Sequence, residues 1–379
     1  MRRGTFVRWG VPIAAAAVIG AAIGAGPVIA AVSGDPVLPE RSAQQLLADA
    51  AAAVEKSEGM PPMSGTVQQT SSLGLPPLPD TGDGSPLSLL SGSHEVKLWY
   101  GDENKMRLAL PTQFNETNLI LNGDQLWYWN SDTNTATRVK MQEEHREARP
   151  TPTAPAVTPQ QAAQRFLEQA GESTTISVSN TAEVAGRPAY QLVLTPKDEA
   201  SLVQEVRVAI DGEHYVPLRV QVFAKGSAEP AFQVGFTQLT FTPPAEENFT
   251  FTPPAGAKVE EKAFGPSDVD TSHADGAKQV AETAKVQGGG WTAVAVLPAD
   301  ALAQEKDETG QEKDPRRGGE ADAQTLLDTA LQAATPVSGE WGSGKLLRTK
   351  LLTILLTDDG RLLVGAVTPE EITKAAGVQ

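Results

Sequence analysis

The chain has 379 residues, of which 40% are hydrophobic, and it carries a formal net charge of -16 without any cysteine. Such a length allows about two or three domains with a buried core, whereas the acidic charge without a basic stripe excludes a nucleic-acid-binding protein. The lack of cysteine excludes disulfides and a lipidated N-terminal cysteine.

The N-terminus has the residue order of a secretory signal. Arg2, Arg3 and Arg8 precede an apolar stretch over residues 11–32, the order of a charged and then a hydrophobic region. The stretch is about 20 residues long, enough to span a bilayer, and Val28-Ile29-Ala30 offers small residues for cleavage. We therefore expect an extracytoplasmic protein, with residues 1–32 as a cleaved signal peptide or as an N-terminal anchor in the cell membrane.

The next segment begins with a helix and a strand. Ser42 and Gln45 have the spacing of a capping box, which predicts a helix over 42–57, and residues 64–72 have the pattern of a strand. A loop rich in Pro, Gly and Ser follows over 75–92. Apolar and polar residues then alternate in five short segments, which predict a meander of strands at 94–101, 104–110, 117–122, 125–131 and 135–140.

A connector with four prolines, 149–159, ends this meander. Thr158 and Pro159 start a helix that ends before Gly171, and a second meander runs over 175–252. Alternation with period two is typical of strands with one buried face. The sequence therefore predicts the α+β class over residues 42–262, with a curved antiparallel half-barrel sheet and helices covering its concave face.

The composition changes after residue 262. Residues 263–290 are small and polar and are predicted to be a linker. Residues 291–379 are predicted to form a small C-terminal α+β module with a flexible segment at 303–320. Its expected elements are strands over 291–297, 346–357 and 361–367, a helix over 321–334 and a last helix from Pro369.

Catalytic and metal-binding patterns are missing from the sequence. There is no His-x-x-x-His or Gly-x-Ser-x-Gly motif, and Gly339 to Lys345 begins like a P-loop but has Leu346 where Ser or Thr binds magnesium. The four histidines lie in separate segments, at His94, His145, His214 and His273. We expect no metal, no cofactor and no enzymatic activity.

One strand has bulky groups on both faces, because it contains Leu126-Trp127-Tyr128-Trp129. In one interpretation, one pair of these side chains fills the core and the other packs under a loop. In the other interpretation, one pair forms an aromatic floor that faces a ligand.

The order of the elements, with five motifs, resembles the lipoprotein carrier (LolA-like) superfamily and its RseB-like sigma-factor regulatory branch, in an actinobacterial-type member. These motifs are Ser64-Gly65-Thr66-Val67, Leu98-Trp99-Tyr100, Lys105-Met106-Arg107-Leu108, Leu121-Asn122-Gly123-Asp124-Gln125-Leu126-Trp127-Tyr128 and Phe249-x-Phe251-x-Pro253-Pro254-x-Gly256. The resemblance covers residues 42–262 and implies an unclosed half-barrel whose concave apolar face takes up acyl chains. It transfers no catalytic residues.

The alternating apolar positions of the two meanders give a candidate lipid-binding face. For each of these residues, plain core packing is the alternative role. The candidates are Val96, Leu98, Tyr100, Met106, Leu108, Leu110, Leu119, Leu121, Tyr190, Leu192, Leu194, Val206, Val208, Ile210, Leu218, Val220, Val222, Phe232, Val234 and Phe236.

Two functional hypotheses follow. In the first, the protein is a non-catalytic carrier that holds the acyl chains of a lipid or lipoprotein outside the membrane. In the second, it is an envelope-stress sensor or regulator that binds an anti-sigma factor, or another membrane protein, through the C-terminal module. Deletion of residues 265–379 separates them, because a carrier keeps its lipid whereas a regulator loses its partner.

Overall fold

The computed structural model describes residues 38–56, 60–75, 91–141, 158–264, 284–299 and 333–378. Several sequence predictions lie outside these residues. They are the signal or anchor at 1–32, most of the 75–92 loop, most of the connector at 149–159, the flexible segment at 303–320 and almost all of the helix at 321–334.

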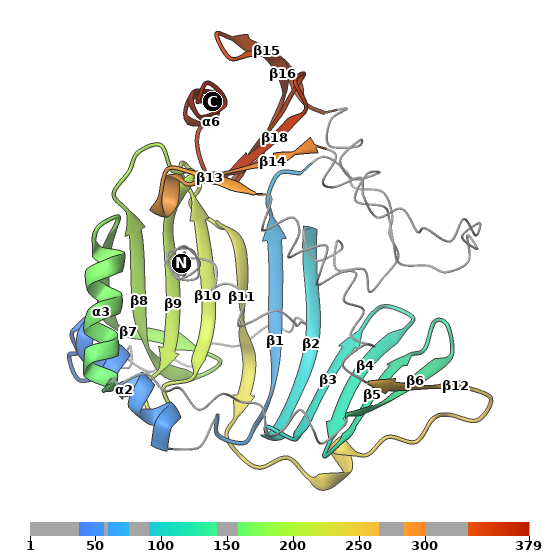
Figure 1. The fold of residues 1–379 in the computed structure, drawn as a ribbon. Helices are drawn as coiled ribbons and strands as arrows, with labels where there is room; N and C mark the ends of the chain where they lie inside the picture. The colour runs from blue at the N-terminus through green and yellow to red at the C-terminus, as the bar shows by residue number, and fades with distance from the viewer. Residues whose placement is uncertain are drawn as a thin grey trace.

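Twelve strands form one large curved sheet that is not closed into a barrel (Figure 1). Their order across the sheet is β12-β6-β5-β4-β3-β2-β1-β11-β10-β9-β8-β7. The bounds are β1 Met63–Ser72, β2 Ser91–Asp102, β3 Lys105–Pro111, β4 Glu116–Asn122, β5 Gln125–Asn130, β6 Thr135–Met141, β7 Thr174–Val184, β8 Arg187–Pro196, β9 Val203–Asp211, β10 Pro217–Ala224, β11 Pro230–Thr240 and β12 Lys258–Phe264. Both predicted meanders are therefore present.

The sheet is antiparallel as predicted, except at one edge, where β12 pairs in parallel with β6. Periodicity does not predict this strand, because Lys and Glu occupy most of its central positions. The chain reaches the far edge by a long segment after β11 that includes the short 3-10 helix η4, Glu246–Phe249. Such a long connection is what a parallel pair requires.

Strand β1 joins the two meanders at the centre of the sheet, since it pairs with β2 on one side and with β11 on the other. The β1–β11 pairing contains a bulge between Thr66 and Val67. Next to the bulge, a Cβ atom on Gly65 would lie 2.5 Å from the carbonyl oxygen of Gln238. Only glycine fits this close approach of two backbones.

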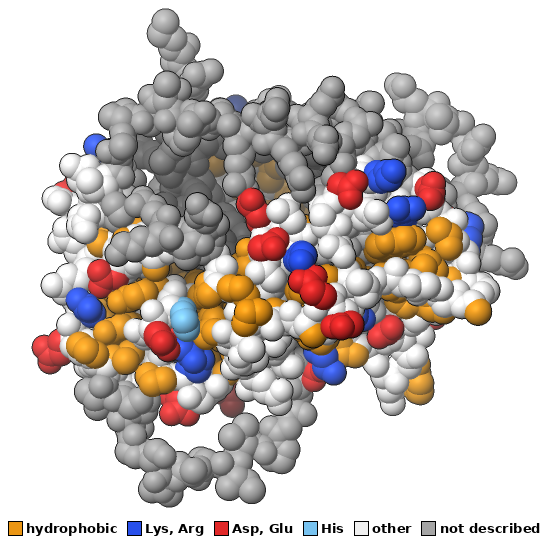
Figure 2. Space-filling model, turned by 90° about the horizontal axis from the view of Figure 1, so that it is seen from below, with side chains coloured by type: hydrophobic (Ala, Val, Ile, Leu, Met, Phe, Trp, Pro, Cys, Tyr) orange, Lys and Arg blue, Asp and Glu red, His pale blue; other side chains and the backbone are white. Residues whose placement is uncertain are grey.

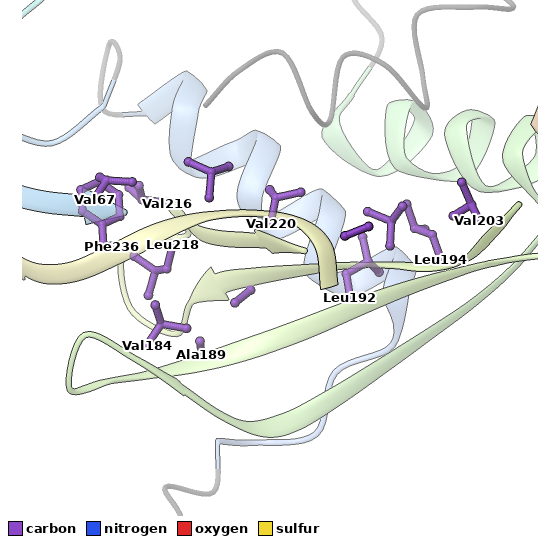
Figure 3. Close-up of a cluster of buried hydrophobic side chains, with 14 of the residues drawn as sticks. Val67, Val184, Ala189, Leu192, Leu194, Val203, Val216, Leu218, Val220 and Phe236 are labelled. Carbon is purple, nitrogen blue, oxygen red and sulfur yellow. The ribbon is translucent and has the colours of Figure 1, made fainter. Parts of the chain in front are cut away.

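Helices α2, Ala43–Lys56, and α3, Pro159–Gly171, lie at the β7–β10 end of the sheet (Figure 1). The predicted capping box of α2 is confirmed, because Ser42 and Gln45 exchange side chain to backbone bonds of 2.9 and 3.2 Å. Leu46 of α2 is buried against Tyr190 and Ile210 of the sheet. Figure 3 shows the core cluster under these helices.

A second sheet of six strands forms the C-terminal part, with the order β13-β14-β18-β17-β16-β15. Its elements are β13 Lys285–Gln287, the 3-10 helix η5 Gly290–Thr292, β14 Val294–Pro298, β15 Thr335–Gly339, β16 Gly342–Arg348, β17 Thr353–Thr357, β18 Arg361–Gly365 and helix α6 Pro369–Ala376. The strand predicted over 291–297 begins only at Val294, since η5 occupies its first residues. Leu355, Leu363 and Ile372 form the centre of a separate core.

The two sheets contact each other at the upper ends of the β8 and β9 strands (Figure 1). The backbone N–H of Leu202 donates to the carbonyl of Ala366 over 2.8 Å, and Ser201 forms a bridge with Val367. Leu351 of the second sheet joins the core cluster of the first. None of the helices in the described residues is long and apolar enough to cross a membrane.

Candidate functional site

The candidate residues lie on one side of the twelve-stranded sheet, which we call the apolar face. Residues directly opposite each other in a strand pair point to the same side. Val67 of β1 lies opposite both Val96 of β2 and Phe236 of β11, which connects the two meanders. The other pairs that continue this face are Leu98–Leu108, Tyr100–Met106, Leu108–Leu119, Met106–Leu121, Tyr190–Ile210, Leu192–Val208, Leu194–Val206, Val208–Val220, Val206–Val222, Val220–Val234 and Val222–Phe232.

Leu218 is the exception among the candidates. The pairing of β10 with β9 shifts between Pro217 and Arg219, so the register does not assign Leu218 to the apolar face. Figure 3 shows its side chain beside Val184 and Ala189 of the β7–β8 hairpin. A bulge re-aims a side chain in this way, and the period-two pattern does not reveal it.

Burial divides the apolar face into two halves. In the β8–β11 half, candidates such as Leu192, Val220 and Val234 are almost completely buried in the core cluster. In the β2–β5 half, Leu98, Leu108 and the candidates of β4 keep part of their surface accessible, and the neighbouring Tyr128 is 43% exposed. The half without a described helix is therefore the accessible part of the face.

Polar side chains interrupt the apolar face on β1, between its two halves. Gln69 lies opposite Val234 on one side and His94 on the other, and Ser71 lies opposite Phe232. Gln69 and Ser71 are each only 5% exposed. The Oγ atom of Ser71 is buried without a hydrogen-bond partner in the described part of the chain.

Tyr100 contributes a phenol to the accessible half. Its burial, followed by the charges of Asp102 and Glu103, raises the pKa of the Tyr100 hydroxyl above its ordinary value. The side chain therefore stays neutral at physiological pH, which suits a surface that contacts apolar groups.

On the opposite face, aromatic side chains of β5 pack against the segment after β11. Trp127 and Trp129 pack against Phe251, with ring centroids 5.3 and 6.0 Å apart, and Phe249 is buried beside Gly101. The two tryptophans thus pack under the segment after β11, whereas Leu126 and Tyr128 point to the apolar face. One pair of side chains therefore packs under another segment, as in the first interpretation, and the other pair lies on the candidate lipid-binding face, as in the second.

No group of three or more metal-ligating side chains occurs in the described ranges. Gly339 and Gly342 border the turn of the β15–β16 hairpin, so the P-loop-like stretch lacks the helix that a phosphate loop requires. Of the four histidines, His94 and His214 lie in the described residues, in β2 and in the β9–β10 turn.

Residues 115–256 match a family model described as the MucB/RseB N-terminal domain. This part of the chain is therefore similar to that domain family. The match confirms the resemblance that the sequence motifs indicate, and it spans β4 to β11 together with the segment that carries Phe249 and Phe251. No curated protein matches the chain.

Solved structures of three kinds are similar to this chain. The Pseudomonas aeruginosa MucA/MucB complex has 15% identity and a TM-score of 0.39, and covers 87% of this chain and 96% of that one. An uncharacterised Thermus thermophilus protein has 12% identity and a TM-score of 0.31, with 56% and 98% covered. A LolA superfamily protein of Nitrosomonas europaea has 10% identity and a TM-score of 0.22, with 53% and 97% covered.

The matched region supplies most of the buried half of the apolar face. Strands β1, β2 and β3, which carry Val67, Leu98 and Leu108, lie before residue 115 and outside the family match. Their place in the same sheet follows from the pairings with β11 and β4. The accessible half therefore combines residues from inside and outside the matched region.

Proposed function

We propose that the protein is a non-catalytic, extracytoplasmic carrier that holds acyl chains of a lipid or lipoprotein against the accessible half of its apolar face. One observation supports this proposal above all. Apart from the buried Val96, the apolar side chains of β2, β3 and β4 form a continuous surface that is only half-buried, whereas the same face is mostly buried over β8–β11.

Apolar surface of this kind has a free-energy penalty in water of about 25 cal/mol per Å². Acyl chains lying across Leu108, Leu119 and Leu121 would remove this surface from water without needing polar contacts. Binding of this type is apolar and loosely specific. Residues 1–32 have a charged region followed by an apolar region, as in a secretory signal. This order supports export of the carrier.

The first experiment asks whether the protein carries lipid when it is purified. A protein of residues 33–379 is purified without detergent. It is then extracted with organic solvent, and the extract is analysed by mass spectrometry. We expect a lipid with acyl chains in the extract and saturable uptake of a fluorescent fatty acid by the delipidated protein. An extract free of lipid, together with no uptake, contradicts the proposal.

A pair of variants tests where the lipid lies. Leu121→Glu places a carboxylate on the accessible half, opposite Met106 and Leu126, and we expect it to weaken fatty-acid binding at least tenfold. Val259→Glu makes the same change at an exposed position of β12 on the other face and should leave binding unchanged. Unfolding curves of both variants show whether each is folded. Equal binding by the two folded variants argues against this location.

A second candidate function is a regulator that binds a membrane partner, such as an anti-sigma factor, through the C-terminal sheet. The observation that favours it is strand β15, an edge strand whose residues are mostly exposed. A free edge can pair with an extended segment of another chain. Deletion of residues 265–379 should abolish partner capture in this case but leave lipid binding intact if the protein is a carrier.

A further inference from the structure

A groove with many polar side chains, the polar groove, lies on the face of the twelve-stranded sheet opposite the apolar face, which we call the outer face. It has a volume of about 910 Å³ and is lined by residues of β1, β2 and the end of β11, and by the turn between β7 and β8. The strand registers place Thr66, Lys97 and Gln238 on the side opposite Val67 and Val96. The groove is therefore separate from the proposed lipid site.

Over β1, a ligand in this groove can use only side chains, because the backbone of β1 is already hydrogen-bonded to β2 and to β11. An extended peptide that binds by adding a strand needs a free sheet edge. The centre of the sheet offers no such edge. The occupant must therefore be recognised by the chemistry of the lining side chains.

These side chains offer both donors and acceptors. Thr66 presents a hydroxyl, Gln238 an amide, Lys97 an ammonium and Glu183 a carboxylate. None of the four side chains has a hydrogen-bond or ion-pair partner among the described residues. One positive and one negative group, with uncharged polar groups between them, match a neutral ligand rich in hydroxyls better than an anion or a cation.

The groove also contains one aromatic ring in a fixed position. The guanidinium of Arg107 lies 5.4 Å from the ring centroid of Trp99. Arg107 itself donates two hydrogen bonds, of 3.0 and 2.8 Å, to Oδ1 of the buried Asn118. This support holds the indole of Trp99 in place before any ligand arrives, which lowers the entropy loss of binding.

We propose that the groove binds a neutral oligosaccharide. The apolar C–H face of a sugar ring packs on the indole of Trp99, and the hydroxyls pair with Thr66, Lys97, Glu183 and Gln238. The volume lies at the upper end of the range for ligand pockets, so it accommodates more than one sugar ring. This site is independent of the acyl-chain site.

The test uses the purified full chain and four neutral probes: tetrasaccharides of N-acetylglucosamine, glucose in α-1,4 and in β-1,4 linkage, and mannose. Titration calorimetry should detect binding of at least one probe, and saturating fatty acid should not displace it. Trp99→Ala should weaken this binding at least tenfold, whereas Trp99→Phe, which keeps an aromatic ring, should recover much of it. Gln238→Ala and Lys97→Met should each weaken it several-fold.

Matched changes outside the groove provide the controls. Gln204→Ala and Lys140→Met alter exposed residues of β9 and β6 that do not line the groove, and they should leave the affinity unchanged. The proposal is overturned if no probe binds at millimolar concentration. It is also overturned if the folded Trp99→Ala and Gln238→Ala variants bind as tightly as the original chain, or if fatty acid competes with the sugar.

Discussion

At the scale of single residues, a polar network surrounds Asp211. Its carboxylate accepts bonds from Nε of Arg187 at 2.5 Å and from the backbone N–H groups of Glu213 and His214 at 3.0 and 2.6 Å. Arg187 also lies over the ring of Phe241, at 4.6 Å. The network therefore connects the β9–β10 turn to the start of β8 and the end of β11.

Seen from below, the molecule shows a band of hydrophobic side chains mixed with charged ones (Figure 2).

Burial of Asp211 by itself raises the pKa of the carboxyl, but the bonds from Arg187, His214 and Glu213 outweigh it and the pKa is lowered overall. A carboxyl with a lowered pKa in the folded state stabilises the fold above its unfolded pKa of about 3.9. This contribution is lost as the pH falls through the folded pKa.

We predict that Asp211→Asn lowers the free energy of unfolding by roughly 2–4 kcal/mol at pH 7, because the half-buried Arg187 loses its buried partner and keeps only the exposed Glu213. The difference from the original chain should shrink as the pH is lowered from about 5 towards 2, where the carboxylate is protonated. Urea denaturation followed by tryptophan fluorescence measures both effects. The exposed Asp124→Asn is the control, and a constant difference at all pH values contradicts this role.

Arg219 is the opposite case, a charged side chain without a described partner. Its stem lies over Gly235, where a Cβ atom would be 2.7 Å from Cγ of Arg219, and its Nε is buried without a hydrogen bond to any described residue. Burial, followed by the nearby charge of Arg207, lowers the pKa of the guanidinium. Both causes disfavour the charge in the folded state.

We therefore expect Arg219→Met to raise the free energy of unfolding by about 1 kcal/mol, since methionine keeps the apolar contact of the stem and removes the unpaired charge. Equilibrium denaturation in urea measures the change. A loss of stability would show that the guanidinium makes a favourable contact with a part of the chain beyond the described residues.

At the scale of elements, the bulge in the β1–β11 pairing accompanies a close approach of the two strands. We predict that Gly65→Ala destabilises the protein by about 1–3 kcal/mol, because the new methyl group would lie 2.5 Å from the carbonyl oxygen of Gln238. Gly171→Ala, at the end of α3, has no atom within 4 Å of the new methyl group and should be neutral or slightly stabilising. Thermal unfolding of the two variants distinguishes them, and similar melting temperatures contradict the prediction.

Local patterns predicted most elements of the sheet. Alternation identified strands such as those containing Leu108, Leu192 and Val220, because their one-sided burial repeats every second residue. The same pattern failed at Leu218, where a bulge changes the direction of the side chain. It also failed for β12, whose pairing depends on a connection that crosses the sheet.

Local sequence patterns do not predict contacts between segments that are far apart in the chain. Phe251 packs against Trp127 and Trp129, yet nothing in either segment identifies the other as its partner. The polar groove likewise arises only when the β7–β8 turn comes close to β1 and β2. The candidate apolar face was predictable because it follows from periodicity within strands, whereas the groove depends on the curvature of the whole sheet.

At the scale of the whole molecule, the loop between β16 and β17 fastens the second sheet to the first. The backbone N–H of Lys350 donates to the carbonyl of Leu73 over 2.8 Å, and its Nζ donates to Oγ of Ser72 over 2.8 Å. Leu351, only 9% exposed, is buried in the core of the large sheet, whereas the adjacent Leu352 is 37% exposed. The division into domains at 42–262 and 291–379 stays a prediction.

We expect Leu351→Asp to release the second sheet without unfolding either core, because a buried carboxylate at this contact is strongly disfavoured. Hydrogen exchange should then become faster at the N–H of Leu202, which donates to Ala366. Leu352→Asp is the adjacent control and should have little effect. Equal exchange in the two variants would show that Leu351 does not hold the sheets together.

The most direct measurement of the carrier proposal is photo-crosslinking with a fatty acid that carries a diazirine near the end of its chain. After irradiation and digestion, mass spectrometry identifies the labelled peptides. We predict labels on β2, β3, β4 and β5, at side chains of the apolar face such as Leu108, Leu121 and Tyr128. Labels confined to the outer face or to the C-terminal sheet, or no saturable labelling at all, would contradict the account.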